Sequence, residues 1–146
     1  MRKISVGDVM TRKVVSVPGE ASLFACSKIM AKHNINSLLI VDGKKLIGIL
    51  TARDVLKAIT KNSNVDLKKT KGIEFASKKI AVIKPSADIA QAIEKMKYLD
   101  FRRLPVIANG ELVGVITLKD ILSIEPHLYA ETKHLMDEIK EFDSKV

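Results

Sequence analysis

The stretch GILTARD, from Gly48 to Asp54, returns 66 residues later as GVITLKD, from Gly114 to Asp120. Both stretches begin with glycine, continue with two aliphatic residues and threonine, and reach aspartate three residues after the threonine. At this offset residues 8–56 align with residues 74–122 without a gap, and the apolar pattern repeats throughout. Only nine positions are identical, but four of them lie between Gly48 and Leu56. The matched pattern therefore indicates a duplicated unit.

Each copy predicts the same succession of elements. The predicted elements are a β-strand (Lys13–Val17 and Lys79–Ile83), a helix (Ser22–His33 and Asp88–Leu99), two strands (Ser37–Val41 and Lys45–Leu50, with counterparts in the second copy) and a short helix (Ala52–Ile59 and Leu118–Ile124). The paired strands turn through DGK and ANG. Because they are almost wholly aliphatic, we expect them to be buried on both faces. The predicted fold class is α/β, with two β-α-β-β-α repeats packed sheet to sheet in pseudo-two-fold symmetry.

The predicted boundaries are a first repeat at 1–60, a polar linker at 61–71, a second repeat at 72–125 and a C-terminal amphipathic helix at 126–146. In this last segment Leu, Thr, Leu, Ile and Phe occupy positions 128, 132, 135, 139 and 142. The 4-3-4-3 spacing is that of a heptad stripe. Such a stripe either packs back on its own domain or meets a partner chain.

Composition favours a soluble cytoplasmic protein. Apolar residues make up 47% of the chain and charged residues 29%, as in globular domains. The longest apolar run, LLIV, is far too short to cross a bilayer, and the N-terminus lacks the apolar centre of a signal peptide. The single cysteine, Cys26, permits no internal disulfide and lies among apolar neighbours, which predicts a core position.

The net charge of +8 points to an anionic partner, or to a lysine-rich surface that only keeps the protein soluble. The partner could be nucleic acid or a phosphorylated small molecule. No nucleic-acid-binding motif is present and aromatic residues for base stacking are few, so nucleic acid is the weaker alternative. The three histidines, His33, His127 and His134, have no metal-ligand spacing, and no nucleophile has a base beside it. We therefore expect no metal site and no catalysis.

The repeated motif can bind a nucleotide. Its glycine would allow a tight turn and the close approach of a ligand. Thr51 and Thr117 fall where a strand gives way to a helix, so they can cap that helix and offer a hydroxyl beside its free N–H groups, which suit phosphate. Asp54 and Asp120 follow one helical turn later and could accept hydrogen bonds from both hydroxyls of a ribose. Ordinary helix capping would explain one copy, but two copies in matched context favour binding.

The chain resembles a tandem pair of cystathionine-β-synthase (CBS) domains, also called a Bateman module, over about 4–124. The similarity rests on VGDVMTRKVVSV, INSLLIVDGKKLIGILTARDVL and FRRLPVIANGELVGVITLKDIL. The second copy departs from the pattern with IEFAS in place of VGDVMT, and the first with SLLI in place of RLPV. The resemblance implies a stand-alone regulatory module, not an enzyme, that binds AMP, ADP, ATP or S-adenosylmethionine in clefts between the copies. It also implies a homodimer that signals to a separately encoded effector protein.

The resemblance further implies a role for each residue. The ribose would be held by Asp54 and Asp120, and the phosphates by Thr51, Thr117, Arg53, Lys119, Arg102 and Arg103. One adenine would meet Lys13, Val14, Val15 and Ile35 in the Asp120 cleft, and the other Lys79, Ile80, Ala81 and Phe101 in the Asp54 cleft. The arginine pair stands where the first copy has Asn36 and Ser37, so the Asp120 cleft is expected to bind phosphorylated ligands more tightly.

Overall fold

The computed structural model of the 146-residue chain describes residues 3–128, 133 and 135. These residues form two compact units. Unit 1 combines Met1–Val14 with Ala81–Val146, and unit 2 is Val15–Ile80. Each unit therefore contains chain from both repeats, because the first residues of each repeat belong to the unit built mainly from the other.

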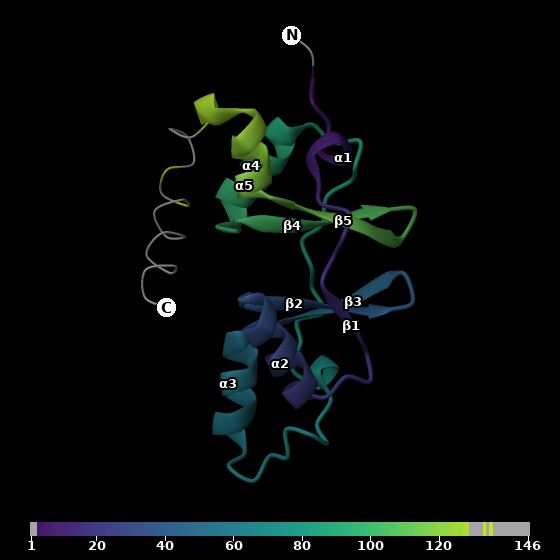
Figure 1. Ribbon diagram of the computed structural model, residues 1–146, viewed down its shortest axis with the longest axis vertical. Helices are drawn as coiled ribbons and strands as arrows, with labels where there is room; N and C mark the ends of the chain where they lie inside the picture. Colours follow the sequence, from purple (N-terminus) through teal and green to yellow (C-terminus); the bar gives the residue numbers. More distant parts are fainter. Residues whose placement is uncertain (1–2, 129–132, 134, 136–146) are drawn as a thin grey trace. The chain divides into compact units, whose positions relative to one another are not determined.

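Unit 2 is a three-stranded sheet with two helices on one face (Figure 1). Its elements are β1 (Ser16–Pro18), α2 (Leu23–His33), β2 (Ser37–Asp42), β3 (Lys45–Thr51), α3 (Ala52–Lys61) and the 3-10 turn η1 (Gly72–Glu74). Strand β1 pairs with β2 in parallel, and β2 with β3 antiparallel. The core between sheet and helices includes Leu23, Cys26, Leu38, Ile40 and Leu50, each at most 1% exposed. The predicted core position of Cys26 is confirmed.

Unit 1 repeats this arrangement with a smaller sheet. Its elements are α1 (Val6–Val9), α4 (Ile89–Leu99), β4 (Arg103–Ala108), β5 (Glu111–Thr117), α5 (Leu118–Ile124) and the 3-10 turn η2 (Pro126–Leu128). Strands β4 and β5 form an antiparallel hairpin, and α4 and α5 cover one of its faces (Figure 1). The core includes Val6 and Leu135, both fully buried. The N-terminal segment and one residue of the predicted C-terminal helix therefore pack into this unit.

Local signals set the ends of the elements. Ser22 caps α2 through its side-chain oxygen, and Asp88 caps α4 in the same way. Both helices end at a residue in the left-handed region, Asn34 and Asp100, which tolerate that backbone because their short polar side chains can bond locally. The hairpin turns use positive φ at Gly43 and at the Asn109–Gly110 pair, as DGK and ANG predict.

Three sequence-based expectations need correction. The first strand is Ser16–Pro18, not Lys13–Val17, and the predicted strand Lys79–Ile83 is reduced to a bridge between Ile83 and Val106. This ladder cannot extend in either direction, because the next backbone N–H donors along it would be those of Pro105 and Pro85, and proline has no N–H. The hairpins are also not fully buried on both faces. Along β2, Leu38 and Ile40 are buried, but the alternate residues Leu39 and Val41 are only half-buried.

The predicted tail stripe is described at two of its five positions. Leu128 packs against the unit 1 core and Leu135 is fully buried in it. Positions 132, 139 and 142, like His134, lie outside the described residues. At the two described positions the stripe contacts its own domain. Of the other histidines, His33 is exposed and His127 pairs with Glu125 at 3.0 Å, so both lie on the surface as predicted.

Candidate functional site

The same threonine–aspartate pair begins a helix in both units. Thr51 caps α3, where its hydroxyl accepts from the Asp54 amide at 3.1 Å and the Asp54 carboxylate accepts from the Thr51 amide at 2.8 Å. Thr117 and Asp120 form the same reciprocal pair at the start of α5, at 3.0 and 3.1 Å. The predicted N-caps are confirmed. Each pair is a capping box, which orients its carboxylate beside the positive end of a helix.

Each aspartate can accept further hydrogen bonds while it caps its helix. In both units the amide bond uses only the Oδ2 oxygen. Among the described residues, no hydrogen bond reaches Oδ1 of Asp54 or Asp120. A carboxylate has about four lone-pair sites, so a second oxygen remains for a ligand's hydroxyl groups. The same two residues can therefore cap the helix and bind a ligand, and the two explanations are compatible.

The motif glycines serve the packing of the chain itself. Gly48 and Gly114 lie inside β3 and β5, with no positive φ, so the expected tight turn is wrong. A Cβ on Gly114 would lie 2.8 Å from the Thr11 carbonyl oxygen and 2.9 Å from the Met10 sulfur. On Gly48 it would lie 2.8 Å from Ile73 Cδ1. Glycine is thus required because another segment crosses the strand there.

We call these crossing segments the arms: residues 3–14 in unit 1 and residues 72–80 in unit 2. Thr11 exchanges both backbone hydrogen bonds with Val115 of β5, each at 2.9 Å. Ser77, at the matching position 66 residues later, exchanges both with Ile49 of β3, also at 2.9 Å. Each repeat therefore contributes its first residues to the sheet of the other repeat.

The unit 1 arm brings a residue to the site that the sequence analysis missed. The Thr11 hydroxyl donates to Oδ2 of Asp120 at 3.4 Å. Its counterpart Ser77 donates instead to the carbonyl of Lys79 at 3.2 Å. A hydroxyl at the same position of both repeats was the available signal, but only the exchanged pairing reveals what Thr11 contacts. The two sites therefore differ in the surroundings of the carboxylate.

A guanidinium lies near the Asp120 carboxylate. Arg103 is the cross-strand neighbour of Thr117, which places the two side chains on one face of the hairpin. Although the side chain is exposed overall, partial desolvation lowers the pKa of Arg103, as does the charge of Arg102, while the Asp120 carboxylate raises it. The guanidinium stays charged at any ordinary pH. In unit 2 the matching neighbour of Thr51 is Ser37.

For the other predicted phosphate-binding residues the structure gives exposure and position in the fold. Arg102 is half-buried, and its carbonyl accepts from the amide of Leu118 at 2.8 Å. Lys119 and Arg53 are exposed beside the two aspartates in the first turn of α5 and α3. Each of these residues lies in the same unit as the aspartate with which it is grouped. Their contact with a phosphate stays a prediction.

The predicted adenine contacts divide between the two units. Lys13 and Val14 belong to unit 1 with Asp120, whereas Val15 and Ile35 belong to unit 2. The second set divides in the opposite sense: Lys79 and Ile80 lie in unit 2 with Asp54, and Ala81 and Phe101 in unit 1. The adenine contacts therefore stay predictions.

The part of the chain that the structure describes holds neither a metal-binding cluster nor a membrane-spanning helix. Within residues 3–128, 133 and 135, no three His, Cys, Asp or Glu side chains gather as a metal site would require. Among the same residues, no helix has the length and apolar character needed to span a bilayer.

The duplicated units and their twin capping boxes define a tandem module, and comparison with known proteins identifies its class. The sequence profile of the CBS domain matches residues 6–61 and 72–127. The chain therefore belongs to the CBS domain family and contains two copies of the domain.

Individual relatives agree with this assignment. The chain is 34% identical over 145 residues to the uncharacterized protein MK0525 of Methanopyrus kandleri, which covers 97% of this chain and 72% of the relative. Among solved structures, Hypoxic Response Protein I with two coordinated zinc ions matches at a TM-score of 0.71 and 30% identity, covering 82% of this chain and 98% of that one. The CBS domain pair of protein MJ0100, in complex with 5′-methylthioadenosine and S-adenosyl-L-methionine, matches at 0.69 and 27%, covering 86% and 98%.

Proposed function

We propose that this CBS pair is a regulatory module that binds an adenosine compound through the carboxylates of Asp54 and Asp120. The observation that carries the proposal is the pair of identical capping boxes, each with one carboxylate oxygen unused among the described residues. Each unused oxygen could accept hydrogen bonds from the vicinal hydroxyls of one ribose, so each unit could hold a ribose of its own. Each bond would be charge-assisted and contribute about 1.5–3 kcal/mol.

The relatives support an adenosine ligand without specifying which. Protein MJ0100 was solved with 5′-methylthioadenosine and S-adenosyl-L-methionine, which share adenine and ribose but carry no phosphate. In this chain Arg103 stands beside Thr117, so a cation and a carboxylate lie near each other in unit 1. That combination favours a ligand with both ribose and phosphate, such as AMP, ADP or ATP.

Output would come through binding to another protein, not through catalysis. The closing helices carry exposed apolar side chains: Leu56 is 61% exposed and Ile59 41% on α3, and Ile124 is 48% exposed on α5. Exposed apolar residues on a helix surface are suited to a protein interface. We propose that they serve a homodimer or a separately encoded effector. A cytoplasmic location also stays a prediction.

The test is calorimetric titration with AMP and with 2′-deoxy-AMP, after a thermal-shift screen of AMP, ADP, ATP, NAD and S-adenosylmethionine. A ligand at 100 times its dissociation constant should stabilise the fold by about 2.7 kcal/mol. Removing the 2′-hydroxyl should weaken binding by about 1–3 kcal/mol, because a carboxylate oxygen loses its donor. The protein is unchanged between the two titrations, so misfolding cannot produce the difference. Equal affinities would exclude the ribose role.

A second candidate function, nucleic-acid binding, is favoured by the distribution of charge. Unit 2 carries twelve Lys and Arg against five Asp and Glu, whereas the rest of the chain is nearly balanced. In that unit Lys28 and Lys68 both lie over the exposed ring of Phe24, at 5.6 and 5.1 Å. Titration with single-stranded RNA at several salt concentrations separates the two functions. Phosphate contacts by many lysines would make the affinity fall steeply with salt.

A further inference from the structure

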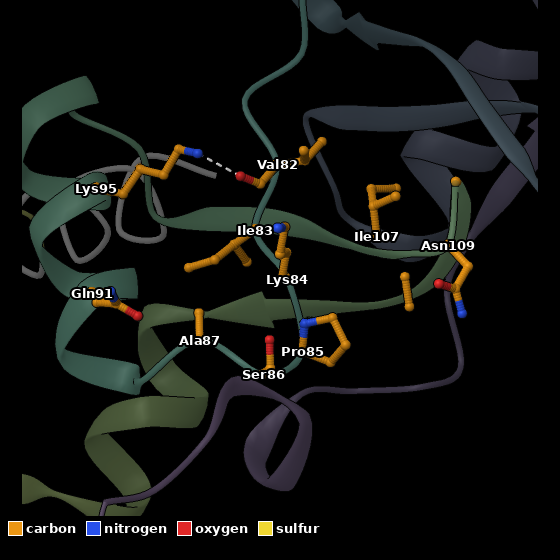
Figure 2. A pocket seen from close by; sticks show the side chains of 12 residues that line it. Val82, Ile83, Lys84, Pro85, Ser86, Ala87, Gln91, Lys95, Ile107 and Asn109 are labelled. Atoms are coloured by element: carbon orange, nitrogen blue, oxygen red, sulfur yellow. Dashed lines mark hydrogen bonds between the residues drawn. The ribbon is translucent and has the colours of Figure 1, made fainter.

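An open pocket of about 900 Å³ is lined wholly by residues of unit 1 (Figure 2). It is open to one side and is lined by the first turns of α4, the segment 82–87 and the turn of the β4–β5 hairpin. Its volume falls in the range of small-molecule sites. Strand β4 runs from Arg103 beside Thr117 to Ala108 at the pocket, and five residues of strand span about 16 Å. The pocket is therefore distinct from the Thr117–Asp120 capping box of the same unit.

The pocket combines an apolar wall with positive charge. Val82, Pro85, Ala87 and Ile107 contribute apolar surface. Lys95 is half-buried, and Figure 2 shows its ammonium directed at the Val82 carbonyl, to which it donates. An ammonium has three donors, so two remain for a ligand.

The polar groups around this wall carry no negative charge. Lys84 is the second cation among the lining residues, and Gln91, Ser86 and Asn109 add neutral groups. The residues that line the pocket include no Asp or Glu.

The first repeat shows that this chemistry is particular to unit 1. At the position of Lys95 the first repeat has Ile29, which packs against the unit 2 core. At the positions of Gln91, Ser86 and Ala108 it has Ala25, Glu20 and Asp42. Across the lining positions the second repeat therefore has two ammonium groups where the first has one, Lys44, and no carboxylate where the first has two. General solubility does not require such a change at a half-buried position.

We propose that this pocket binds a small organic anion with an apolar body, such as a medium-chain carboxylate. The apolar wall would cover the body, and the Lys95 ammonium, fixed by the Val82 carbonyl, would pair with the charge. Lys84 would add attraction from the rim. The absence of carboxylates from the lining excludes a cationic ligand of the same shape. The inference does not depend on nucleotide binding by the capping boxes.

The test is calorimetric titration of the full chain with octanoate, and with octylammonium as its cationic counterpart. Octanoate should bind and octylammonium should not. Lys95→Met keeps the side chain's apolar stem and should weaken octanoate binding at least about tenfold, because one charge-assisted hydrogen bond is lost. Lys97→Met is the matched control: it removes the same charge from the same helix, at a residue that does not line the pocket and pairs with Glu94 instead. It should leave octanoate binding unchanged.

A second variant does not depend on the packing of Lys95. Ala108→Asp introduces the residue that the first repeat carries at the matching position of its own hairpin. Because Ala108 faces Glu111 whereas Asp42 faces Lys45, the control is Ala108→Asn, which has the same shape without the charge. The added carboxylate should repel octanoate and weaken its binding severalfold relative to Ala108→Asn. Equal binding of octanoate and octylammonium would overturn the proposal, as would equal losses in Lys95→Met and Lys97→Met, because either result would indicate nonspecific adsorption.

Discussion

Replacing Gly114 with alanine should destabilise unit 1 by about 1–3 kcal/mol. The new Cβ would lie 2.8 Å from the Thr11 carbonyl oxygen and 2.9 Å from the Met10 sulfur. The end of the Met10 side chain can move, but the Thr11 carbonyl belongs to a backbone segment held by two hydrogen bonds to Val115. If the arm shifts, both bonds weaken, at about 0.5–1.5 kcal/mol each. If it stays, the overpacked contact costs about 1–3 kcal/mol.

Gly48→Ala is the control for this prediction. At that position the nearest atom is the flexible end of Ile73, at 2.8 Å, and the nearest backbone atom, the Ser77 oxygen, lies 3.6 Å away. The side chain can move, so the cost should be about 1 kcal/mol lower than at Gly114. Both substitutions leave the charge and the predicted ligand contacts unchanged.

Urea denaturation followed by circular dichroism measures both costs. Hydrogen exchange at the Val115 amide adds a local probe, because this amide donates to Thr11 only while the arm is paired. We expect a lower midpoint and faster exchange of Val115 in Gly114→Ala than in Gly48→Ala. Parent-like stability of Gly114→Ala, or a larger loss in Gly48→Ala, would refute the assignment of this glycine to arm packing.

Three further predictions follow from the site and the core. Thr117→Ala removes the α5 cap and should cost about 1 kcal/mol in urea denaturation, whereas Thr117→Ser should preserve the cap and the stability. Arg103→Ala should weaken AMP binding strongly and adenosine binding little in calorimetry; equal losses for the two ligands would mean that the arginine does not contact phosphate. Burial raises the pKa of the Cys26 thiol above 9.0, so the unfolded chain loses this proton first and stability should fall as pH rises through and above 9. Cys26→Ala should flatten this part of the pH profile, and an unchanged slope would assign it to other groups.

The features that the sequence predicted correctly are local. Thr51 and Thr117 were identifiable as caps because each stands between an aliphatic strand and an amphipathic helix, and the capping bonds span only three residues. The hairpins were identifiable from their turn residues for the same reason. Such signals are contained in a short window, so tertiary context seldom overrides them.

The features that the sequence did not predict are long-range or differ between the repeats. Thr11 pairs with Val115, 104 residues away, and the repeated pattern fits pairing within a repeat as well as pairing between repeats. The same ambiguity hid the contact of Thr11 with Asp120 and led to the wrong explanation of the glycines. The second repeat loses its first strand because Pro85 and Pro105, which stand where the first repeat has Gly19 and Leu39, lack the N–H groups that would extend the pairing. That effect depends on a strand register that the sequence alone does not fix.

The exchange of arms also sets an order of events during synthesis. Unit 2 is one continuous segment and can fold as soon as residue 80 has left the ribosome, since Ser77 finds Ile49 only 28 residues behind it. The arm at 3–14 must instead wait for Val115, which at about 5–20 residues per second takes roughly 5–20 s. During that interval Val9 and Met10, which end in the unit 1 core, remain uncovered on the nascent chain. The arm at 3–14 therefore emerges well before its partner strand and is among the last segments to fold, so it is a part of the newborn protein that a chaperone would find exposed.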